Sequence, residues 1–186
     1  MEDRVRLHEE TRITPLTRAK EIWYNMNQNM ETTGNITICC GVDPGKLGAL
    51  AVLFPEGDAQ LFNFSEDEFF GAIRMLATIP SRAKVVVALE HVGGIPGQSA
   101  PAAFNFGDNF GFIRGLLTAY EIPYELVRPQ KWKKEFSCTS DKNTSIEVAR
   151  RLFPGVDLKR TERCKKDDDG RAEALLLAEY ARRHMA

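Results

Sequence analysis

The segment Lys84-Val-Val-Val-Ala-Leu-Glu90 constrains the fold more than any other part of this 186-residue sequence. Its interior is apolar at every position, whereas a strand with one face in water alternates apolar and polar residues. The segment is therefore predicted to be a central β-strand that is covered on both faces. Periodicity by itself leaves an α/β and an α+β arrangement open.

Closely spaced strands are expected ahead of this segment. The turn signal Pro55-Glu-Gly57 separates two of them, and three strands so close together favour an antiparallel meander. The three strands are expected at Ile36–Val42, Gly48–Phe54 and Asp58–Phe64. A further strand is expected later in the chain, at Tyr124–Val127.

Helices are predicted between and after these strands. Ser65 followed by Glu68 is a capping-box pattern, which begins a helix that extends to about Thr78. The other helices are expected at Ala100–Tyr120, Gln130–Phe136, Asn143–Phe153 and Gly170–Met185. Residues 1–35 are polar and contain one short helical stretch around Leu16–Met30, so we expect them to form a flexible N-terminal extension. Residues 36–186 are expected to form the domain itself.

Length and composition suit one globular domain. Hydrophobic residues make up 43% and charged residues 27% of the chain, which is ordinary for a soluble protein. No apolar run approaches the roughly 18 residues that a membrane helix needs, and the charged N-terminus is not followed by the apolar core of a signal peptide. The four cysteines contain no C-x-x-C pair, which argues against a zinc site and a disulfide framework. We therefore expect an intracellular protein without a membrane partner, in the cytoplasm or nucleoid, or in a host cytoplasm if it is viral.

Charge is distributed unevenly along a chain whose net charge is only −1. Residues 128–166 contain twelve Lys or Arg and five acidic residues, whereas residues 55–70 contain five acidic residues and no basic one. The basic segment favours contact with a polyanion such as nucleic acid, and the alternative is a set of solvated helix faces. The candidates for phosphate contacts are Lys131, Lys133, Lys134 and Lys142.

Two carboxylates are expected at the ends of strands. Asp43 follows the first strand in Gly-Val-Asp-Pro-Gly, where Pro44 removes a backbone donor and Gly45 permits a positive φ, so the chain is expected to turn sharply there. An ordinary Asp-Pro-Gly turn is the alternative explanation. Glu90 ends the apolar strand, a position where a carboxylate is costly unless it pairs with a partner or binds a cation.

Two further carboxylates share one face of the last helix. Asp169 and Glu173 are four residues apart, so they repel each other and require a neutralising partner. Acidic residues near a helix N-terminus also have a purely structural explanation in the helix dipole. Carboxylates that converge from separate elements suit hard divalent cations, and two such ions can promote phosphodiester hydrolysis. The sequence therefore predicts a nuclease site at Asp43, Glu90, Asp169 and Glu173.

Several segments together resemble the RuvC-like Holliday junction resolvases, in particular the branch found in phages, bacteria and chloroplasts. The resemblance covers roughly 150 residues, from Ile36 to the C-terminus, and the order of the expected elements is that of the ribonuclease H-like fold. The matching segments are Gly41-Val-Asp-Pro-Gly45, the strand that ends at Glu90, Pro96-Gly-Gln98, Phe104-Asn-Phe-Gly107, Phe110–Leu117, Pro129–Lys134 and Asp169–Ala178.

This resemblance implies an α/β domain with a central mixed five-stranded sheet (βββαβαβ) flanked by helices. It implies a homodimer that binds four-way junction DNA and makes paired nicks. By motif position it implies that Asp43, Glu90, Asp169 and Glu173 bind two Mg²⁺ ions per site, with Mn²⁺ as a substitute and no organic cofactor.

One residue departs from the pattern of this branch. Relatives often have His immediately before the Asp-Gly-Arg, where this chain has Asp168. An imidazole there could position water or carry a proton, whereas a carboxylate adds negative charge beside the metal ions. Either Asp168 is a further metal ligand, or the activity and metal preference differ from those of the family.

Glycines carry two further expectations. The loop Gly93–Ser99 allows its backbone to approach DNA closely, and we expect it to contact the open centre of a junction; a flexible connector is the alternative. The contacts are assigned to Gly93, Gly94, Ile95 and Gln98.

In the helix expected at Ala100–Tyr120, Gly107, Gly111 and Gly115 line one face. Either this helix packs closely on its own sheet, or two copies pair across a two-fold axis. Aromatic residues nearby are expected to be mostly core, namely Phe104, Phe106, Phe110, Phe112 and Trp132.

Three other functions remain open from the sequence. The chain could be another ribonuclease H-like nuclease that acts on flaps, branched DNA or RNA–DNA hybrids. It could also be a catalytically inactive junction-binding protein, if Asp168 reflects loss of activity. An actin-like ATPase is disfavoured, because such proteins need two lobes of this kind and the chain is long enough for only one.

Overall fold

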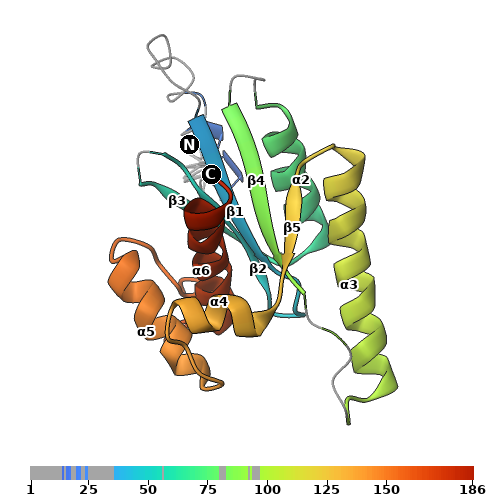
Figure 1. The fold of residues 1–186 in the computed structure, drawn as a ribbon, viewed down its shortest axis with the longest axis vertical. Helices are drawn as coiled ribbons and strands as arrows, with labels where there is room; N and C mark the ends of the chain where they lie inside the picture. Colours follow the sequence, from blue (N-terminus) through green and yellow to red (C-terminus); the bar gives the residue numbers. More distant parts are fainter. Residues whose placement is uncertain are drawn as a thin grey trace, which may run out of the picture.

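The computed structural model describes residues 14, 16–17, 20–21, 24, 36–55, 57–79, 83–91, 93 and 97–186. Five strands form one mixed sheet in the order β3-β2-β1-β4-β5, with helices on both faces (Figure 1). The strands are β1 (Ile36–Asp43), β2 (Ala49–Leu53), β3 (Ala59–Asn63), β4 (Ala83–Glu90) and β5 (Tyr124–Val127). The helices are α2 (Glu66–Ala77), α3 (Ala100–Ala119), α4 (Pro129–Glu135), α5 (Lys142–Leu152) and α6 (Asp169–His184). The expected α/β architecture with a five-stranded mixed sheet is confirmed.

Strand pairing brings the ends of β1 and β4 together. Strands β1, β2 and β3 are antiparallel neighbours, so the expected meander is confirmed. Strand β4 is parallel to both β1 and β5, and it lies inside the sheet as its apolar sequence predicts. Because Val42 pairs with Leu89, the next residues, Asp43 and Glu90, leave the sheet at the same edge.

The two faces of the sheet carry side chains of different size. Successive residues of a strand point to opposite faces. One face carries small residues, among them Cys39, Ala49, Ala51 and Ala88, and packs against α4, α5 and α6. The other face carries larger residues, among them Ile38, Leu50, Val52 and Leu89, and packs against α2 and α3.

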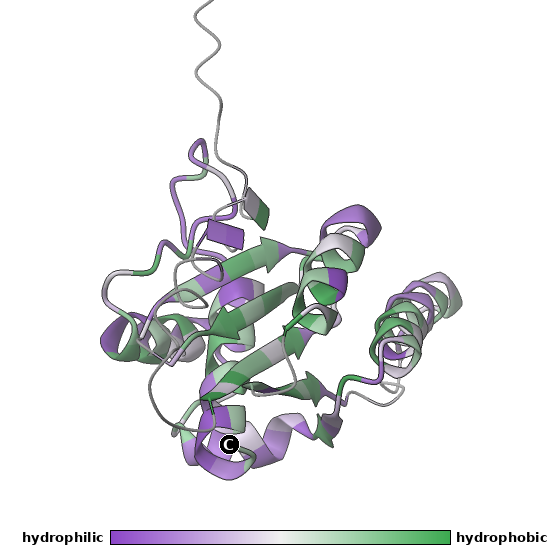
Figure 2. Cartoon of the chain, turned by 90° about the horizontal axis from the view of Figure 1, so that it is seen from above, coloured by the Kyte–Doolittle hydropathy of each residue, from purple (hydrophilic) through white to green (hydrophobic). Residues whose placement is uncertain are grey.

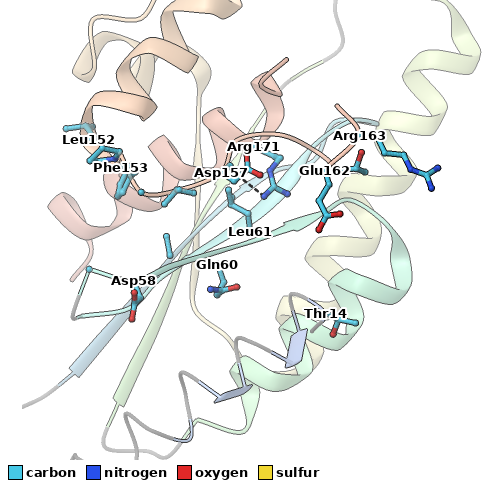
Figure 3. A pocket seen from close by; sticks show the side chains of 16 residues that line it. Thr14, Asp58, Gln60, Leu61, Leu152, Phe153, Asp157, Glu162, Arg163 and Arg171 are labelled. Carbon is cyan, nitrogen blue, oxygen red and sulfur yellow. Dashed lines mark hydrogen bonds between the residues drawn. The ribbon is translucent and has the colours of Figure 1, made fainter. Parts of the chain in front are cut away.

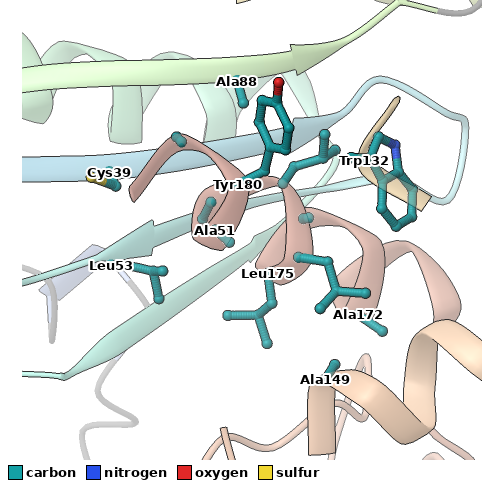
Figure 4. Packing of buried hydrophobic residues seen from close by; sticks show 14 of the residues in the cluster. Cys39, Ala51, Leu53, Ala88, Trp132, Ala149, Ala172, Leu175 and Tyr180 are labelled. Carbon is teal, nitrogen blue, oxygen red and sulfur yellow. The ribbon is translucent and has the colours of Figure 1, made fainter. Parts of the chain in front are cut away.

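The small residues let α6 approach β1 very closely (Figure 4). A Cβ atom added to Gly41 would lie 2.1 Å from the backbone nitrogen of Ala178 and 2.2 Å from the carbonyl oxygen of Ala174. Eleven residues of α6 are buried, from Gly170 to Ala181. Helix α6 is therefore enclosed by the sheet on one side and by α5 on another, rather than docked through a single apolar face.

Helix α3 is far less covered than α6. Its buried residues are Ile113 and Leu117, and it lies at one side of the molecule (Figure 2). The expectation that its phenylalanines are mostly core holds only in part. Phe110 and Phe112 are partly buried and pack against the core, whereas Phe104 is 74% exposed and Phe106 is only partly buried.

Smaller features follow the sequence closely. Ser65 caps α2 by accepting a hydrogen bond from the Glu68 backbone N–H at 3.2 Å, as the capping-box pattern predicts. In the N-terminal extension, Leu16 packs against the core near Gly71 of α2, and most of the extension lies outside the described residues. Within the described part of the chain, no helix is long and apolar enough to cross a membrane.

Candidate active site

Asp43 ends β1 and is held by the turn that follows it. The Gly45 backbone N–H donates to Asp43 Oδ1 at 2.9 Å, and the Gly48 N–H donates to the Gly45 carbonyl at 2.8 Å. The sharp turn is confirmed, and it forms without a positive φ at Gly45. The essential glycine is Gly48, where an added Cβ would lie 2.0 Å from the Asp43 carbonyl oxygen.

The Asp43 turn lies directly on the N-terminus of α6. A Cβ atom on Gly170 would lie 2.3 Å from the Leu47 carbonyl oxygen and 3.1 Å from Asp43 Oδ2. Gly170 therefore allows the carboxylate of Asp43 to approach the first turn of α6. Asp169 is the first residue of that helix, and Glu173 follows one turn later.

The carboxylates of β1, β4 and α6 influence one another electrostatically. Burial raises the pKa of Asp43 to about 6; the Gly45 N–H lowers it, and the charges of Glu173 and Asp169 raise it. Burial also raises the pKa of Glu90 to about 8, the charges of Asp43 and Glu173 add to that rise, and the Trp132 N–H opposes it. In each case burial, helped by the negative charge of neighbouring carboxylates, destabilises the ionised form.

Lysines from α4 and α5 supply part of that charge. Lys133 Nζ lies 2.9 Å from Glu173 Oε1, and Ser145 Oγ lies 3.3 Å from the same oxygen. Lys142 forms an ion pair with Asp169. These contacts provide the neutralising partners that the spacing of Asp169 and Glu173 requires. Two lysines that we assigned to phosphate contacts thus form ion pairs with the carboxylates in this structure.

Trp132 holds the carboxylate of Glu90. Its side chain is fully buried, as expected of a core anchor, and its indole N–H donates to Glu90 Oε1 at 2.9 Å. We did not predict this bond, since the two residues are 42 positions apart. Trp132 directly precedes Lys133 in the sequence, and the two residues contact Glu90 and Glu173. The short helix α4 therefore binds carboxylates from both β4 and α6, and this adjacency is the signal that the sequence offered.

The donor chemistry of this site fits a hard divalent cation. All four candidate ligands are carboxylates, the donors that Mg²⁺ prefers. Burial and the neighbouring negative charges raise the pKa values of Asp43 and Glu90, so a bound cation would favour their ionised forms. Among the residues that the structure describes, no three His, Cys, Asp or Glu side chains are arranged to hold one ion. The ion pairs of Lys133 and Lys142 direct Glu173 and Asp169 toward ammonium groups instead.

The remaining predicted residues lie around this centre. Asp168 caps α6 and pairs with Arg160. Lys131 pairs with Glu125 at 3.2 Å, and Lys134 is exposed. In the loop after β4, Gly93 is exposed and Gln98 partly buried, while Gly94 and Ile95 lie outside the described residues.

A separate hollow has Arg171 in its lining (Figure 3). It is lined by β3, the end of α5 and the connection to α6, including Gln60, Phe153, Asp157 and Arg163. None of the four candidate ligands lines this hollow. The hollow therefore does not form part of the carboxylate site.

The fold is similar to that of solved Holliday junction resolvases. Thermus thermophilus RuvC in complex with a Holliday junction substrate superimposes with a TM-score of 0.52 and 14% identity, covering 82% of this chain and 98% of RuvC. Another T. thermophilus RuvC structure gives a TM-score of 0.47 at 14% identity, covering 80% and 95% of the two chains. The yeast mitochondrial Holliday junction resolvase Ydc2 gives 0.40 at 12% identity, covering 89% and 88%.

Comparison by sequence finds no match, either to a protein-family model or to a curated protein. With 14% identity, the similarity to RuvC shows the fold alone. The expected ribonuclease H-like fold is confirmed, and membership of the resolvase family remains a prediction.

Proposed function

We propose that this protein is a divalent-cation-dependent endonuclease that cuts branched DNA, with four-way junctions as its preferred substrate. The observation that carries the proposal is the group of carboxylates at one edge of the sheet. Asp43, Glu90, Asp169 and Glu173 come from β1, β4 and α6, and their charges affect one another's protonation. A turn can explain the position of Asp43, and the helix dipole can explain Asp169. Neither explains why Glu90 is buried beside them.

The four carboxylates would hold two Mg²⁺ ions, or Mn²⁺ in their place. When bound, such ions activate a water molecule and stabilise the leaving oxygen of a phosphodiester. The protein itself orients the ligands. The Gly45 N–H and the Trp132 indole each fix one carboxylate oxygen, which restricts the orientations of Asp43 and Glu90 before a cation binds.

Lysines near the site would then bind the DNA backbone. The Lys142 side chain is 70% exposed, so it can turn away from Asp169 once a cation neutralises that carboxylate. Lys131, Lys133 and Lys134 lie on the adjacent helix α4. Phosphate contacts of this kind position the substrate without reading its sequence.

Helix α3 supports a dimeric arrangement. A four-way junction has two scissile strands related by two-fold symmetry, and paired nicks require two active sites. Within the described part of the chain, an added Cβ at Gly107, Gly111 or Gly115 would have no atom of another element within 4 Å, so close packing of this helix on its own sheet does not explain these glycines. We infer that a second copy of α3 covers this surface.

Nicking assays on defined DNA structures test the proposal. We expect Mg²⁺-dependent, paired nicks in an immobile four-way junction and little cutting of a linear duplex of the same sequence. Asp43→Asn and Glu90→Gln should abolish cutting and leave junction binding intact, because each change keeps the side-chain shape and removes charge. Asp67→Asn, at an exposed carboxylate of α2, is the matched control and should cut normally.

Three results would contradict the proposal in different ways. Normal nicking by Asp43→Asn would exclude the carboxylate site. Preferential cutting of flaps or RNA–DNA hybrids would support nuclease activity but contradict the four-way junction as the preferred substrate. Junction binding without Mg²⁺- or Mn²⁺-dependent cutting would identify an inactive binding protein.

A further inference from the structure

Arg160 connects two parts of the site that the sequence keeps far apart. Its Nε donates to Asp168 Oδ2 at 3.1 Å. Its Nη2 donates to the Gly48 carbonyl at 3.0 Å and also to the Leu47 carbonyl. One guanidinium therefore binds both the N-cap of α6 and the turn between β1 and β2, which begins at Asp43.

The backbone of Arg160 is fixed as well. Its carbonyl accepts a hydrogen bond from Asn63 Nδ2 of β3 at 2.9 Å. Asn63 Oδ1 in turn accepts from Arg171 Nη1 at 2.8 Å, and the Arg171 backbone N–H donates to Asp168 Oδ1 at 3.0 Å. The contacts form a closed ring through β3, α6 and the loop before α6. Arg171 also donates to the Asp157 carbonyl of that loop (Figure 3).

We propose that Arg160 and Asp168 are positioning residues, whose ion pair holds the Asp43 turn against the N-terminus of α6 and so sets the separation of Asp43 and Asp169. Asp168 is then a structural partner of Arg160 and contributes no bond to a cation. The inference rests on the proposed function in one respect, that Asp43 and Asp169 bind the cation.

The contacts of Asp168 carry this assignment. Both of its carboxylate oxygens are engaged, one by the Arg171 N–H and the other by Arg160. The side chains of Arg160 and Asp168 are only 20% and 14% exposed, so water competes little for the pair. Because Arg160 neutralises Asp168, this carboxylate adds no net charge beside the four candidate ligands.

The position of the turn explains why such a pair matters. Gly170 leaves no room for a side chain between α6 and the Leu47 carbonyl, so the two segments are in direct contact. Gly41 fixes the middle of α6 on β1, and Arg160 fixes its first residues on the turn. A small shift of this turn would move Asp43 relative to Asp169. Substitution of residues that support metal ligands typically lowers metal affinity about 10- to 100-fold.

Hydrogen exchange of the metal-free protein tests the contact without any ligand. Arg160→Met should increase exchange of the peptide that contains Gly45–Gly48 at least tenfold, while exchange in β4 stays unchanged and circular dichroism shows a folded protein. Arg163→Met, at an exposed arginine of the same loop, is the control and should leave this peptide protected. Unchanged protection in Arg160→Met would overturn the proposal.

Titration with Mn²⁺, followed by electron paramagnetic resonance, tests the positioning role. Arg160→Met and Asp168→Asn should each weaken Mn²⁺ binding about tenfold, and the double variant should be no weaker than either single one, because both remove the same pair. Arg160→Lys should recover only part of the affinity, since an ammonium lacks the forked donors of a guanidinium. Asn can still accept the Arg171 N–H, so the cap of α6 is retained.

The outcomes separate the competing assignments. A further loss of affinity when Asp168→Asn is added to Arg160→Met would identify Asp168 as a metal ligand and overturn the proposal. Wild-type affinity in Arg160→Met would overturn it as well. A wild-type protein that binds no Mn²⁺ would defeat the proposed function, while the exchange experiment would still decide whether Arg160 holds the turn.

Discussion

Small residues lie at the surfaces of both α6 and α3. Contacts within the described part of the chain explain the small residues at α6 but do not explain those of α3. At Gly41, beneath α6, an added Cβ would lie 2.1 Å from the backbone nitrogen of Ala178. At Gly111 of α3, an added Cβ would meet no atom of the described residues outside its own helix within 4 Å. Close packing on its own sheet thus explains the small residues around α6, and it explains none of the three glycines of α3.

The difference in burial agrees with different tasks for the two helices. Helix α6 carries Asp169 and Glu173, and its burial between the sheet and α5 holds these carboxylates beside Asp43. Helix α3 exposes Phe104 and only partly buries Phe106 and Phe110. Exposed apolar surface of this kind marks an interaction site, which agrees with the proposed pairing of two copies.

The largest expected effect comes from adding one methyl group beneath α6. Gly41→Ala should destabilise the protein by roughly 4 kcal/mol or more, the upper end for single substitutions, because backbone atoms of α6 must move. Urea unfolding followed by circular dichroism measures the change. A loss below about 1 kcal/mol would show that α6 is not held against β1 as closely as the structure indicates.

A cavity in the core should cost somewhat less. Leu175→Ala removes a fully buried side chain of α6 and should cost about 3 kcal/mol. Phe104→Ala, on the exposed part of α3, should change the free energy of unfolding of the monomer by less than about 0.5 kcal/mol. Similar losses for both substitutions, measured below the concentration at which dimers form, would remove the contrast between the two helices.

A bulky residue on α3 should affect association and spare folding. Gly111→Leu should weaken dimerisation at least tenfold, or about 1.4 kcal/mol, because the proposed seam requires close approach of two helices. Analytical ultracentrifugation should show a folded monomer, and junction assays should show slow single nicks in place of paired ones. An unfolded protein or an unaltered dimer would place the seam elsewhere.

The smallest effect is expected from the matched change in α3. Gly111→Ala should stabilise the monomer by up to about 1 kcal/mol, since alanine favours helix over glycine and its Cβ would meet no neighbour among the residues that the structure describes. A Gly→Ala substitution is therefore expected to lower the free energy of unfolding at Gly41 and to raise it at Gly111. Thermal unfolding of the two variants under identical conditions provides the comparison, and destabilisation by Gly111→Ala would show a contact of α3 that the structure lacks.

Local sequence signals determined the elements and the carboxylates of this protein. The apolar run before Glu90 predicted a central strand, and the Ser65 cap predicted the start of α2, because strand burial and helix capping depend on residues close together in the chain. The four candidate ligands were also evident, since each lies at the end of an element or on one helix face. Whether they bind a cation remains a prediction.

Tertiary structure alone decided what supports those carboxylates. Trp132 reaches Glu90, Lys133 reaches Glu173, and Arg160 reaches Gly48 across 112 residues of sequence. The order of strands brings these segments together, and no periodicity of a single segment encodes that order. For the same reason, the sequence alone does not distinguish Gly41 from Gly111. The conformational cost of a glycine is local, whereas the atoms that occupy the space of its missing side chain belong to another part of the fold or to another molecule.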